Sequence, residues 1–414
     1  PLGGVDATFT KAEKFLKENN IKFQYGLNED LAATALWGSQ QTELHNEGKY
    51  AGVFGLWYGK GPGVDRCGDV FRHSNLAGTS KYGGVLVAMG DDHSAESSTE
   101  LHQSEYALVD AMMPILSPAG VQDILDFGIK GWALSRYSGL WVGIKCLKDT
   151  IEVTEVVDAS YDRVKIVDPQ DKDHEELNIR LGDTPPARED RLHNKKLKAA
   201  KVFARANDLN KVDYSPAQRK IGIISAGKSW LDTVHALSLL GIERDQAEKY
   251  KLTTLKLGMV WPIDDSFIRE WANGLEKILV VEEKRGLIEA QVKEALYGTT
   301  NSPQIIGKQD HNGELLLPSN GVLDPIIVGK AIANKLIGAS KTEKLENSLK
   351  SISTSARNEA NTPAPDRIPY FCSGCPHNSS TKVPEGSIAY AGIGCHTMAI
   401  CCLLYTSPSP RDSI

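Results

Sequence analysis

The sequence has 414 residues, of which 41% are hydrophobic and 24% charged, which excludes a fibre or a disordered tail and is enough for two or three domains. The net charge is -6 with acidic and basic residues well mixed, which argues against nucleic acid as a partner and favours a small substrate. No apolar run approaches the roughly 18 residues that span a bilayer, and the N-terminus carries no signal sequence, so we expect no membrane association. The seven cysteines cluster toward one end, which indicates metal chemistry in a reducing cytoplasm.

The first part of the chain predicts two helices around a short strand. Helical spacing at residues 11–20 is followed by an alternating, strand-like run at residues 21–25. Residues 26–38 then predict a helix that Asn28 caps, with Glu29 in its first turn, where an acidic side chain suits the helix dipole. By itself this pattern indicates a well-capped amphipathic helix rather than a catalytic site.

The glycine-rich region at residues 51–90 predicts two buried parallel strands, at residues 53–58 and 84–89, each followed by glycine. Ligands of open α/β sheets lie beyond the carboxyl ends of the strands. The loops expected at residues 59–66 and 90–93 are therefore where a site would form. Either loop could equally be a tight turn between a strand and a helix.

Helix-like and strand-like segments continue to alternate up to residue 156, which predicts a doubly wound α/β fold. The basic run at residues 191–201 is typical of a solvated helix face. A second α/β unit opens at residue 220, where a strand leads into a glycine turn and a helix. Its Gly227-Lys228-Ser229 fits the spacing of a phosphate-binding loop, but an apolar, strand-like run occupies the loop positions, which argues against nucleotide hydrolysis.

A linker and a cysteine-rich segment follow. The Ser/Thr/Asn/Pro-rich composition of residues 339–366 predicts the linker. Cys372 and Cys375 then form a C-x2-C pair, and Cys395 follows twenty residues after Cys375. Two thiolates so spaced can face one ion or cluster from a single tight turn, and Gly374 between them eases that turn. This is a metal-ligand pattern.

Four separated motifs in this order resemble the long-form indolepyruvate:ferredoxin oxidoreductases, which belong to the thiamine-diphosphate-dependent 2-oxoacid:ferredoxin oxidoreductases. They are Gly-Leu-Asn-Glu-Asp-Leu at 26–31, Lys-Gly-Pro-Gly-Val-Asp-Arg at 60–66, Gly-Asp-Asp at 90–92, and Cys-Ser-Gly-Cys-Pro-His-Asn at 372–378. The similarity extends from about residue 1 to about residue 400. It implies an α/β thiamine-diphosphate-binding fold with doubly wound parallel sheets and a transketolase-C-like α/β domain.

The resemblance also implies a division into domains. The expected parts are a pyrimidine-binding domain with an extension at 1–217, a transketolase-C-like domain at 218–310, a helix and linker at 311–365, and the start of a diphosphate-binding, iron–sulfur domain at 366–401. Residues 402–414 lose all periodicity and resemble translated sequencing-adapter sequence, so they are excluded from the fold.

The activity that the resemblance implies is the oxidative decarboxylation of indolepyruvate or a related aryl 2-oxoacid. The acyl group would pass to coenzyme A, and the electrons would pass through iron–sulfur clusters to ferredoxin. Glu29 resembles the glutamate that hydrogen-bonds the aminopyrimidine of thiamine diphosphate and promotes removal of the cofactor's C2 proton. Cys372, Cys375 and Cys395 resemble three ligands of a [4Fe-4S] cluster, whose fourth ligand we expect beyond this sequence.

Other candidate residues follow from the same resemblance. Arg66 and His73 are candidates to meet the carboxylate of the 2-oxoacid, Arg66 by a bidentate fork. They could equally hold the loop in place. The residues expected to lie next to the cofactor are Gly61, Pro62, Gly63 and Asp65. Cys67 and Cys146 are expected to be buried structural thiols.

The family's Gly-Asp-Gly motif, which holds the magnesium of the diphosphate, does not occur in the sequence. We therefore expect a C-terminally truncated fragment that is inactive alone, taken from a homo-oligomeric parent. The missing initiator methionine further indicates that the fragment begins inside a longer reading frame. Two alternatives remain open. One is another thiamine enzyme without a cluster, and the other is a non-enzymatic protein whose three clustered cysteines hold a structural zinc with His377 or His396.

Overall fold

The computed structural model describes residues 3–45, 48–95, 101–170, 177–361, 371–382 and 395. The chain forms two compact units, one made of Pro1–Ser94 and His102–Ser353 and the other of Ala95–Leu101 and Thr354–Ile414. The larger unit contains two β-sheets. Within the described residues, no helix combines the length and the apolar character that crossing a bilayer requires.

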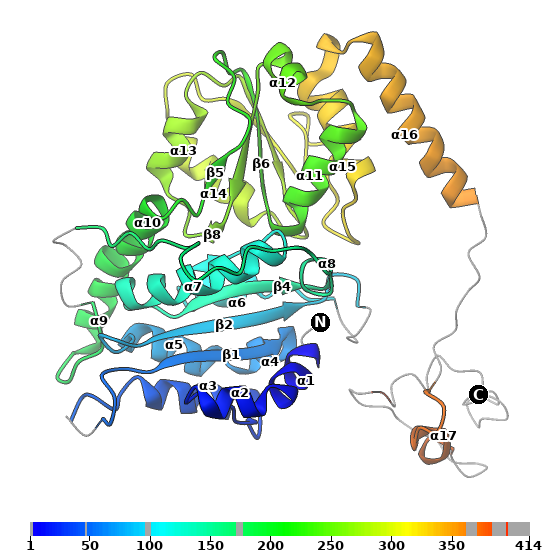
Figure 1. Ribbon diagram of the computed structural model, residues 1–414. Coiled ribbons are helices and arrows are strands. Elements are labelled where there is room, and N and C mark those ends of the chain that lie inside the picture. Colours follow the sequence, from blue (N-terminus) through cyan, green and yellow to red (C-terminus); the bar gives the residue numbers. More distant parts are fainter. Residues whose placement is uncertain are drawn as a thin grey trace, which may run out of the picture. The chain divides into compact units, whose positions relative to one another are not determined.

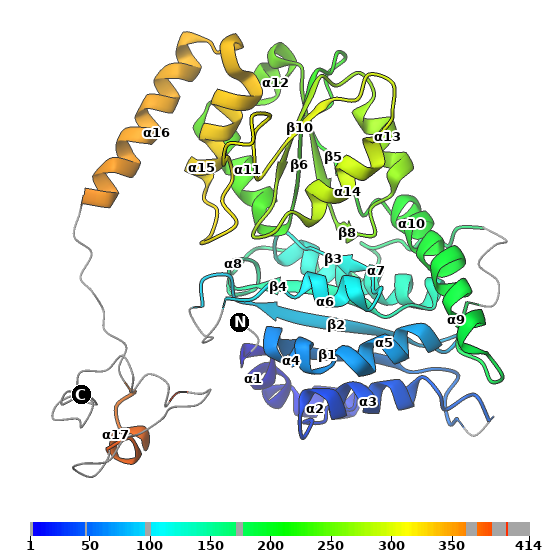
Figure 2. The same cartoon turned by 180° about the vertical axis from the view of Figure 1, so that it is seen from behind.

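The first sheet of the larger unit has the strand order β1-β2-β4-β3-β8 (Figures 1 and 2). Its strands are β1 (Phe54–Lys60), β2 (Gly84–Asp91), β3 (Ile115–Leu116), β4 (Val142–Leu147) and β8 (Met259–Trp261). The first four are parallel, whereas β8 pairs antiparallel with β3. Every residue of β2 and β4 is buried, as expected for central parallel strands with helices on both faces.

Helices cover both faces of this sheet. They are α1 (Gly3–Lys11), α2 (Glu13–Glu18), α3 (Glu29–Ser39), α4 (Gly61–Arg66), α5 (Gly68–Ala77), α6 (Glu105–Asp110), α7 (Val121–Ser138), α8 (Lys148–Ile151), α9 (Pro185–Arg191) and α10 (Leu197–Ala206), with the π-helical η2 (Leu192–Lys196) between the last two. Alternate residues of β2 separate the two faces: Val87 belongs to the core beneath α4 and α5, and Leu86 to the core beneath α7 and α10. The predicted doubly wound arrangement is confirmed here.

The second sheet has the strand order β10-β9-β6-β7-β5. Its strands are β5 (Lys211–Val212), β6 (Ile221–Ala226), β7 (Leu252–Leu257), β9 (Lys277–Val281) and β10 (Gln304–Ile306). Around them lie α11 (Gly227–Leu239), α12 (Arg244–Tyr250), α13 (Asp265–Ala272), α14 (Leu287–Leu296), α15 (Pro325–Ala331), the π-helical η3 (Ile332–Ile337), η4 (Gly338–Ser340) and α16 (Glu343–Asn361). Figures 1 and 2 show α11 and α15 together on one face of this sheet and α13 and α14 on the other.

Strand β6 continues to Ala226 and α11 begins at Gly227, so the Gly227-Lys228-Ser229 segment has no phosphate-binding loop before it. The apolar run that argued against nucleotide hydrolysis is therefore a buried strand.

Three expectations about local structure were wrong. The described residues 21–26 form no strand, because Phe23 packs its ring on Phe9 of α1, 5.2 Å away, instead of joining a sheet. Much of the expected linker is helix α16, whose Leu345 and Ile352 bury one face against the second sheet's core. The basic run also differs, since Lys196 is fully buried rather than solvated.

Candidate active site

Glu29 is the first residue of α3, and its backbone is held from two sides. The Asn28 side chain accepts a hydrogen bond from the Leu31 N–H at 2.9 Å, which confirms the predicted cap. The indole N–H of Trp57, a buried residue of β1, donates to the carbonyl oxygen of Glu29 at 3.0 Å. The start of α3 is thus fixed to the sheet, while the Glu29 side chain remains 44% exposed.

The segment after β1 is a short helix, α4, and not the loop that the sequence predicted. Pro62 lies in its first turn, where the missing N–H removes no hydrogen bond. A Cβ on Gly63 would lie 2.7 Å from Cγ of Glu29, and a Cβ on Gly61 would overlap the imidazole ring of His102. Each of these glycines therefore leaves room for a side chain from another segment.

Arg66 ends α4 and lies beside the first turn of α3. Its Nη1 is 4.0 Å from Oε2 of Glu29, and its Nε is 3.6 Å from Oδ1 of Asp30. All three side chains are about half exposed, so solvent screens these pairs. The structure therefore brings together Glu29, Gly63 and Arg66, three of the residues selected from the sequence.

Two cysteines that were expected to be structural are buried. Burial raises the pKa of the Cys67 thiol to about 12, and burial likewise raises the pKa of Cys146 to about 12. Neither forms the thiolate that a nucleophile or metal ligand requires near neutral pH.

His73 lies apart from Glu29 and Arg66. Its Nδ1 is 3.0 Å from the Asp69 carbonyl oxygen and 3.3 Å from the Asp69 carboxylate, one turn earlier in α5. Its ring is 6.2 Å from that of Trp37, which is eight residues after Glu29 and so about 12 Å further along α3. The structure therefore does not bring the two candidate substrate residues together.

Asp65, also selected from the sequence, contacts a histidine that sequence reasoning missed. Oδ2 of Asp65 is 2.8 Å from Nε2 of His102. The other ring nitrogen, Nδ1, is 3.2 Å from Ser104 Oγ and 3.6 Å from the Asp91 carboxylate. Interaction with Asp91 raises the pKa of His102 to about 9, with Asp65 adding to the effect and burial opposing it.

Asp91 ends β2 and is fully buried. The Ser104 N–H donates to both carboxylate oxygens, at 3.1 and 2.9 Å, and Nζ of Lys145 is 3.8 Å away. Burial acts to raise the pKa of Asp91, but the contacts from His102, Lys145 and Ser104 outweigh it and hold that pKa below its usual value. Asp91 is therefore ionised although it is buried, because its neighbours offset the cost of burying its charge.

Lys145, in the middle of β4, pairs with the buried Glu105. Burial acts to lower the pKa of Lys145, yet Glu105 and Asp91 keep it above its usual value. Burial raises the pKa of Glu105 itself. Sequence reasoning overlooked this group, although a lysine inside an apolar strand segment was a visible signal.

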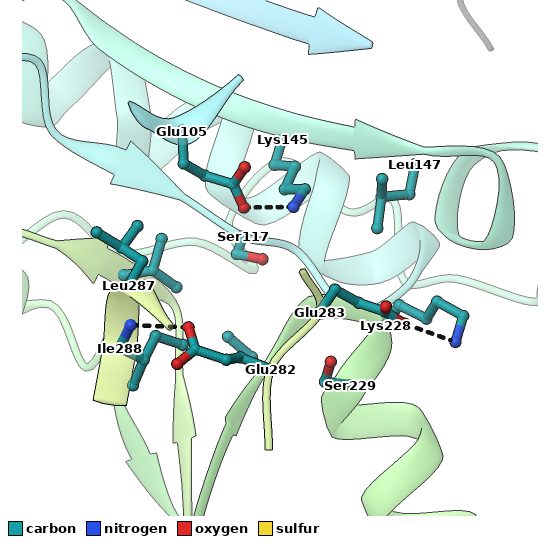
Figure 3. Close-up of a pocket in the computed structure, with 12 residues that line it drawn as sticks. Glu105, Ser117, Lys145, Leu147, Lys228, Ser229, Glu282, Glu283, Leu287 and Ile288 are labelled. Carbon is teal, nitrogen blue, oxygen red and sulfur yellow. Dashed lines mark hydrogen bonds and ion pairs between the residues drawn. The ribbon is translucent and has the colours of Figure 1, made fainter. Parts of the chain in front are cut away.

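A second set of buried charges faces this one from the second sheet. Nζ of Lys228, in the first turn of α11, donates to Asp232 at 2.7 Å, to Glu283 at 3.1 Å and to the Leu323 carbonyl oxygen at 2.6 Å. Figure 3 shows Glu105 and Lys145 on one side of a small cavity and Lys228 and Glu283 on the other. The cavity measures about 30 Å³, which is room for about one water molecule.

His93 lies close to the same charges and is buried. Its Nδ1 is 4.0 Å from Oε2 of Glu283. Burial, helped by the positive charge of Lys145, lowers the pKa of His93 to about 2. The imidazole is therefore neutral at physiological pH.

The cysteine pair of the smaller unit forms the tight turn that its spacing predicted. The Cys375 N–H donates to the Cys372 carbonyl oxygen at 2.9 Å, and Gly374 has a φ of +77°, which favours glycine. The short helix α17 (His377–Ser380) follows, and Nδ1 of His377 is 3.2 Å from Sγ of Cys375.

Cys395 is exposed and lies in the same unit. Within the part of the chain that the structure describes, no three His, Cys, Asp or Glu side chains form a group that could hold a metal ion. His396 and residues 402–414 lie outside the described residues. The assignment of the three cysteines as cluster ligands therefore stays a prediction.

Comparison with known proteins shows what this architecture is similar to. Residues 211–359 match the family described as the indolepyruvate oxidoreductase domain. The resemblance to indolepyruvate oxidoreductases inferred from the sequence motifs is thereby confirmed.

Relatives of the indolepyruvate oxidoreductase type extend the similarity over most of the chain. The indolepyruvate oxidoreductase subunit IorA of Methanothermobacter thermautotrophicus is 25% identical over 404 residues, covering 93% of this chain and 58% of the relative. IorA of Pyrococcus horikoshii is 24% identical over 396 residues, covering 93% of this chain and 56% of the relative. The chain thus spans somewhat more than half the length of these relatives.

Among solved structures, the chain is similar to the 2-oxoglutarate:ferredoxin oxidoreductase of Magnetococcus marinus, solved with 2-oxoglutarate, coenzyme A and succinyl-CoA bound. The TM-score is 0.53 at 14% identity, over 80% of this chain and 60% of that one. At this identity the likeness shows the fold. The predicted α/β fold of the thiamine-diphosphate-binding type is confirmed.

Proposed function

We propose that the full protein is a thiamine-diphosphate-dependent oxidoreductase that oxidatively decarboxylates indolepyruvate or a related aryl 2-oxoacid. It transfers the acyl group to coenzyme A and the electrons to ferredoxin. The observation that carries the proposal is the placement of Glu29 at the capped start of α3, against Gly63 and beside Arg66. The names of the relatives support indolepyruvate as the type of substrate. The ligands bound in the similar solved structure support a 2-oxoacid substrate and coenzyme A as acyl acceptor.

The surroundings of Glu29 fit thiamine diphosphate. Its backbone is fixed by Trp57, while its carboxylate is 44% exposed and can meet a ring that docks against it. When bound, thiamine diphosphate supplies the carbanion that adds to the keto carbon and the electron sink for decarboxylation. Glu29 would hold a proton at the aminopyrimidine nitrogen, and Gly63 would keep the adjoining backbone of α4 close to it.

The cysteine turn fits one side of an iron–sulfur cluster. Cys372 and Cys375 lie on a single turn, and we assign both as ligands together with Cys395. We place the protein in the cytoplasm, whose reducing conditions keep cluster-binding cysteines out of disulfides. Since the sequence has no Gly-Asp-Gly motif, we assign no residue of this chain to the magnesium that thiamine diphosphate needs.

The test of Glu29 uses the full-length protein with its cofactors. Glu29→Gln should keep the iron content and lower 2-oxoacid-dependent dye reduction by about 10²–10⁴-fold, the contribution of a positioned proton-transfer group. Asp30→Asn is the matched control, because Asp30 is the next residue, is similarly exposed and also faces Arg66. Turnover retained in Glu29→Gln would remove the catalytic role.

Two further measurements test the identity of the metal site and the preference among 2-oxoacids. Stoichiometric iron and sulfide with broad visible absorbance would support the iron–sulfur cluster, whereas zinc without colour would indicate a structural metal site instead.

Steady-state rates with indolepyruvate, phenylpyruvate and pyruvate rank the 2-oxoacids as substrates. A higher kcat/KM for pyruvate than for the aryl acids would contradict the proposed preference.

A further inference from the structure

The helix α4 is held by two side chains that come from distant parts of the sequence. Glu29 fills the space that a Cβ on Gly63 would need, and the His102 ring fills the space that a Cβ on Gly61 would need. Residues two apart on a helix point about 200° apart, toward nearly opposite sides. Glu29 and His102 therefore support α4 from different sides.

His102 is fixed at both ring nitrogens. Nε2 is 2.8 Å from Asp65 of α4 itself, and Nδ1 is 3.2 Å from Ser104 Oγ. The side chain is only 16% exposed. The ring therefore lies against α4 with its polar atoms already engaged, which leaves it poorly placed to bind a substrate.

The charged and polar groups around His102 favour its protonated form. Asp65 faces it from α4, Asp91 from the end of β2 and Ser104 from the segment before α6, while Lys145 of β4 lies behind Asp91. The contact with Asp91 raises the pKa of His102 to about 9. A cation thus joins the exposed carboxylate of Asp65 to the buried carboxylate of Asp91.

We propose that His102 is a positioning residue of the candidate active site, which anchors α4 to the end of β2 and so keeps Gly63 against Glu29. This inference rests on the proposed function for its catalytic meaning. It adds a residue that neither spacing nor the resemblance indicated. The anchoring itself can be tested without any cofactor.

The first experiment measures amide hydrogen exchange by mass spectrometry on the full-length protein. His102→Ala should accelerate exchange across residues 61–67 by about tenfold, the scale of one lost charge-assisted hydrogen bond, and leave α11 unchanged. Asp65→Asn should accelerate the same segment less, because Asp65 is 61% exposed and its loss leaves the Asp91 contact in place. His235→Ala, an exposed histidine of α11, is the control.

The second experiment measures thiamine diphosphate affinity against pH. In the wild type the affinity should fall as pH rises through about 9, because the imidazole then loses the proton that binds it to Asp65 and Asp91. His102→Gln should bind about tenfold more weakly at neutral pH, again the scale of one hydrogen bond, and should lack the step near pH 9. If His102 had only a structural role, His102→Gln would still show the step in affinity near pH 9.

The outcomes separate the two proposals. Equal exchange of residues 61–67 in the wild type and in His102→Ala would overturn the positioning role, whatever the protein binds. A wild-type protein that binds no thiamine diphosphate would overturn the proposed function, while the exchange experiment would still decide whether His102 anchors α4.

Discussion

Glu29 and Lys145 each lie near an opposite charge, but in different surroundings. Oε2 of Glu29 is 4.0 Å from Nη1 of Arg66, and both side chains are about half exposed. Lys145 is buried between Glu105 and Asp91, inside the sheet. Groups whose pKa values are shifted by burial and by neighbouring charges gather around Lys145 and His93. The charges that hold the fold are thus separated from the carboxylate that we assign to chemistry.

This separation has an energetic meaning. A buried ion pair roughly balances desolvation against attraction, yet the loss of one partner leaves an uncompensated charge in the interior. An exposed pair is screened, and its loss costs little. Substitutions at the buried charges should therefore change stability, and those around Glu29 should change activity instead.

The largest effect on stability is expected from Lys145→Met, which keeps the volume of the side chain and removes its charge. Glu105 loses its cationic partner, and Asp91 loses one of its contacts. We expect a loss of about 3–5 kcal/mol in the free energy of unfolding, measured by urea denaturation at pH 7.5.

Two variants check that interpretation. Lys220→Met removes a cation that pairs with Glu276 on the surface, where both side chains are about half exposed or more, and should cost at most about 1 kcal/mol. Combining Lys145→Met with Glu105→Leu should recover most of the lost stability, because no unpaired carboxylate remains at residue 105. A double variant as unstable as the single one would show that packing, and not charge, causes the loss.

The next largest effect concerns His93 and pH. Its pKa in the folded state is about 2, below the value of 6.5 expected in the unfolded chain, so below pH 6.5 the unfolded state binds the additional proton. His93 therefore contributes stability that is present above pH 6.5 and lost as pH falls. Between pH 7.5 and pH 5 this loss amounts to about 2 kcal/mol. His93→Gln should lack this part of the pH dependence in urea denaturation, and identical slopes for the two proteins would contradict it.

Local features of the site could be predicted from sequence, because they depend on neighbouring residues. The Asn28 cap, the position of Glu29 in the first turn of α3 and the turn at Gly374 all follow from backbone rules. Strands β2 and β6 were also found, because buried parallel strands appear as continuous apolar runs.

The remaining features depend on contacts between residues far apart in the chain. His102 contacts Gly61, which is 41 positions away in the sequence, and Lys145 contacts Glu105, which is 40 positions away. Which of these distant residues meet depends on the order of the strands in the sheet. The same limit explains α16. Its composition suggested a linker, but Leu345 and Ile352 repeat at helical spacing and find a core to cover.

Gly63→Ala should have a smaller effect on stability than either buried substitution. Alanine favours the helix by up to about 1 kcal/mol, which offsets the displacement of the half-exposed Glu29 side chain. We expect a net change within about 1 kcal/mol, together with weaker binding of thiamine diphosphate. Gly68→Ala in α5 is the matched control, since a Cβ there meets no atom within 4 Å. Equal affinities in the two variants would contradict the placement of Glu29.

The smallest change in stability is expected from Glu29→Gln, the variant that should lower turnover by about 10²–10⁴-fold. Glu29 loses only a screened contact of 4.0 Å with Arg66, and its backbone contact with Trp57 is unaffected. The free energy of unfolding should therefore stay within about 0.5 kcal/mol of the wild type at pH 7.5. A loss above about 2 kcal/mol would place Glu29 with Lys145, among the charges that hold the fold. Lost turnover with unchanged stability would instead identify the carboxylate as one kept at the surface of α3 for chemistry.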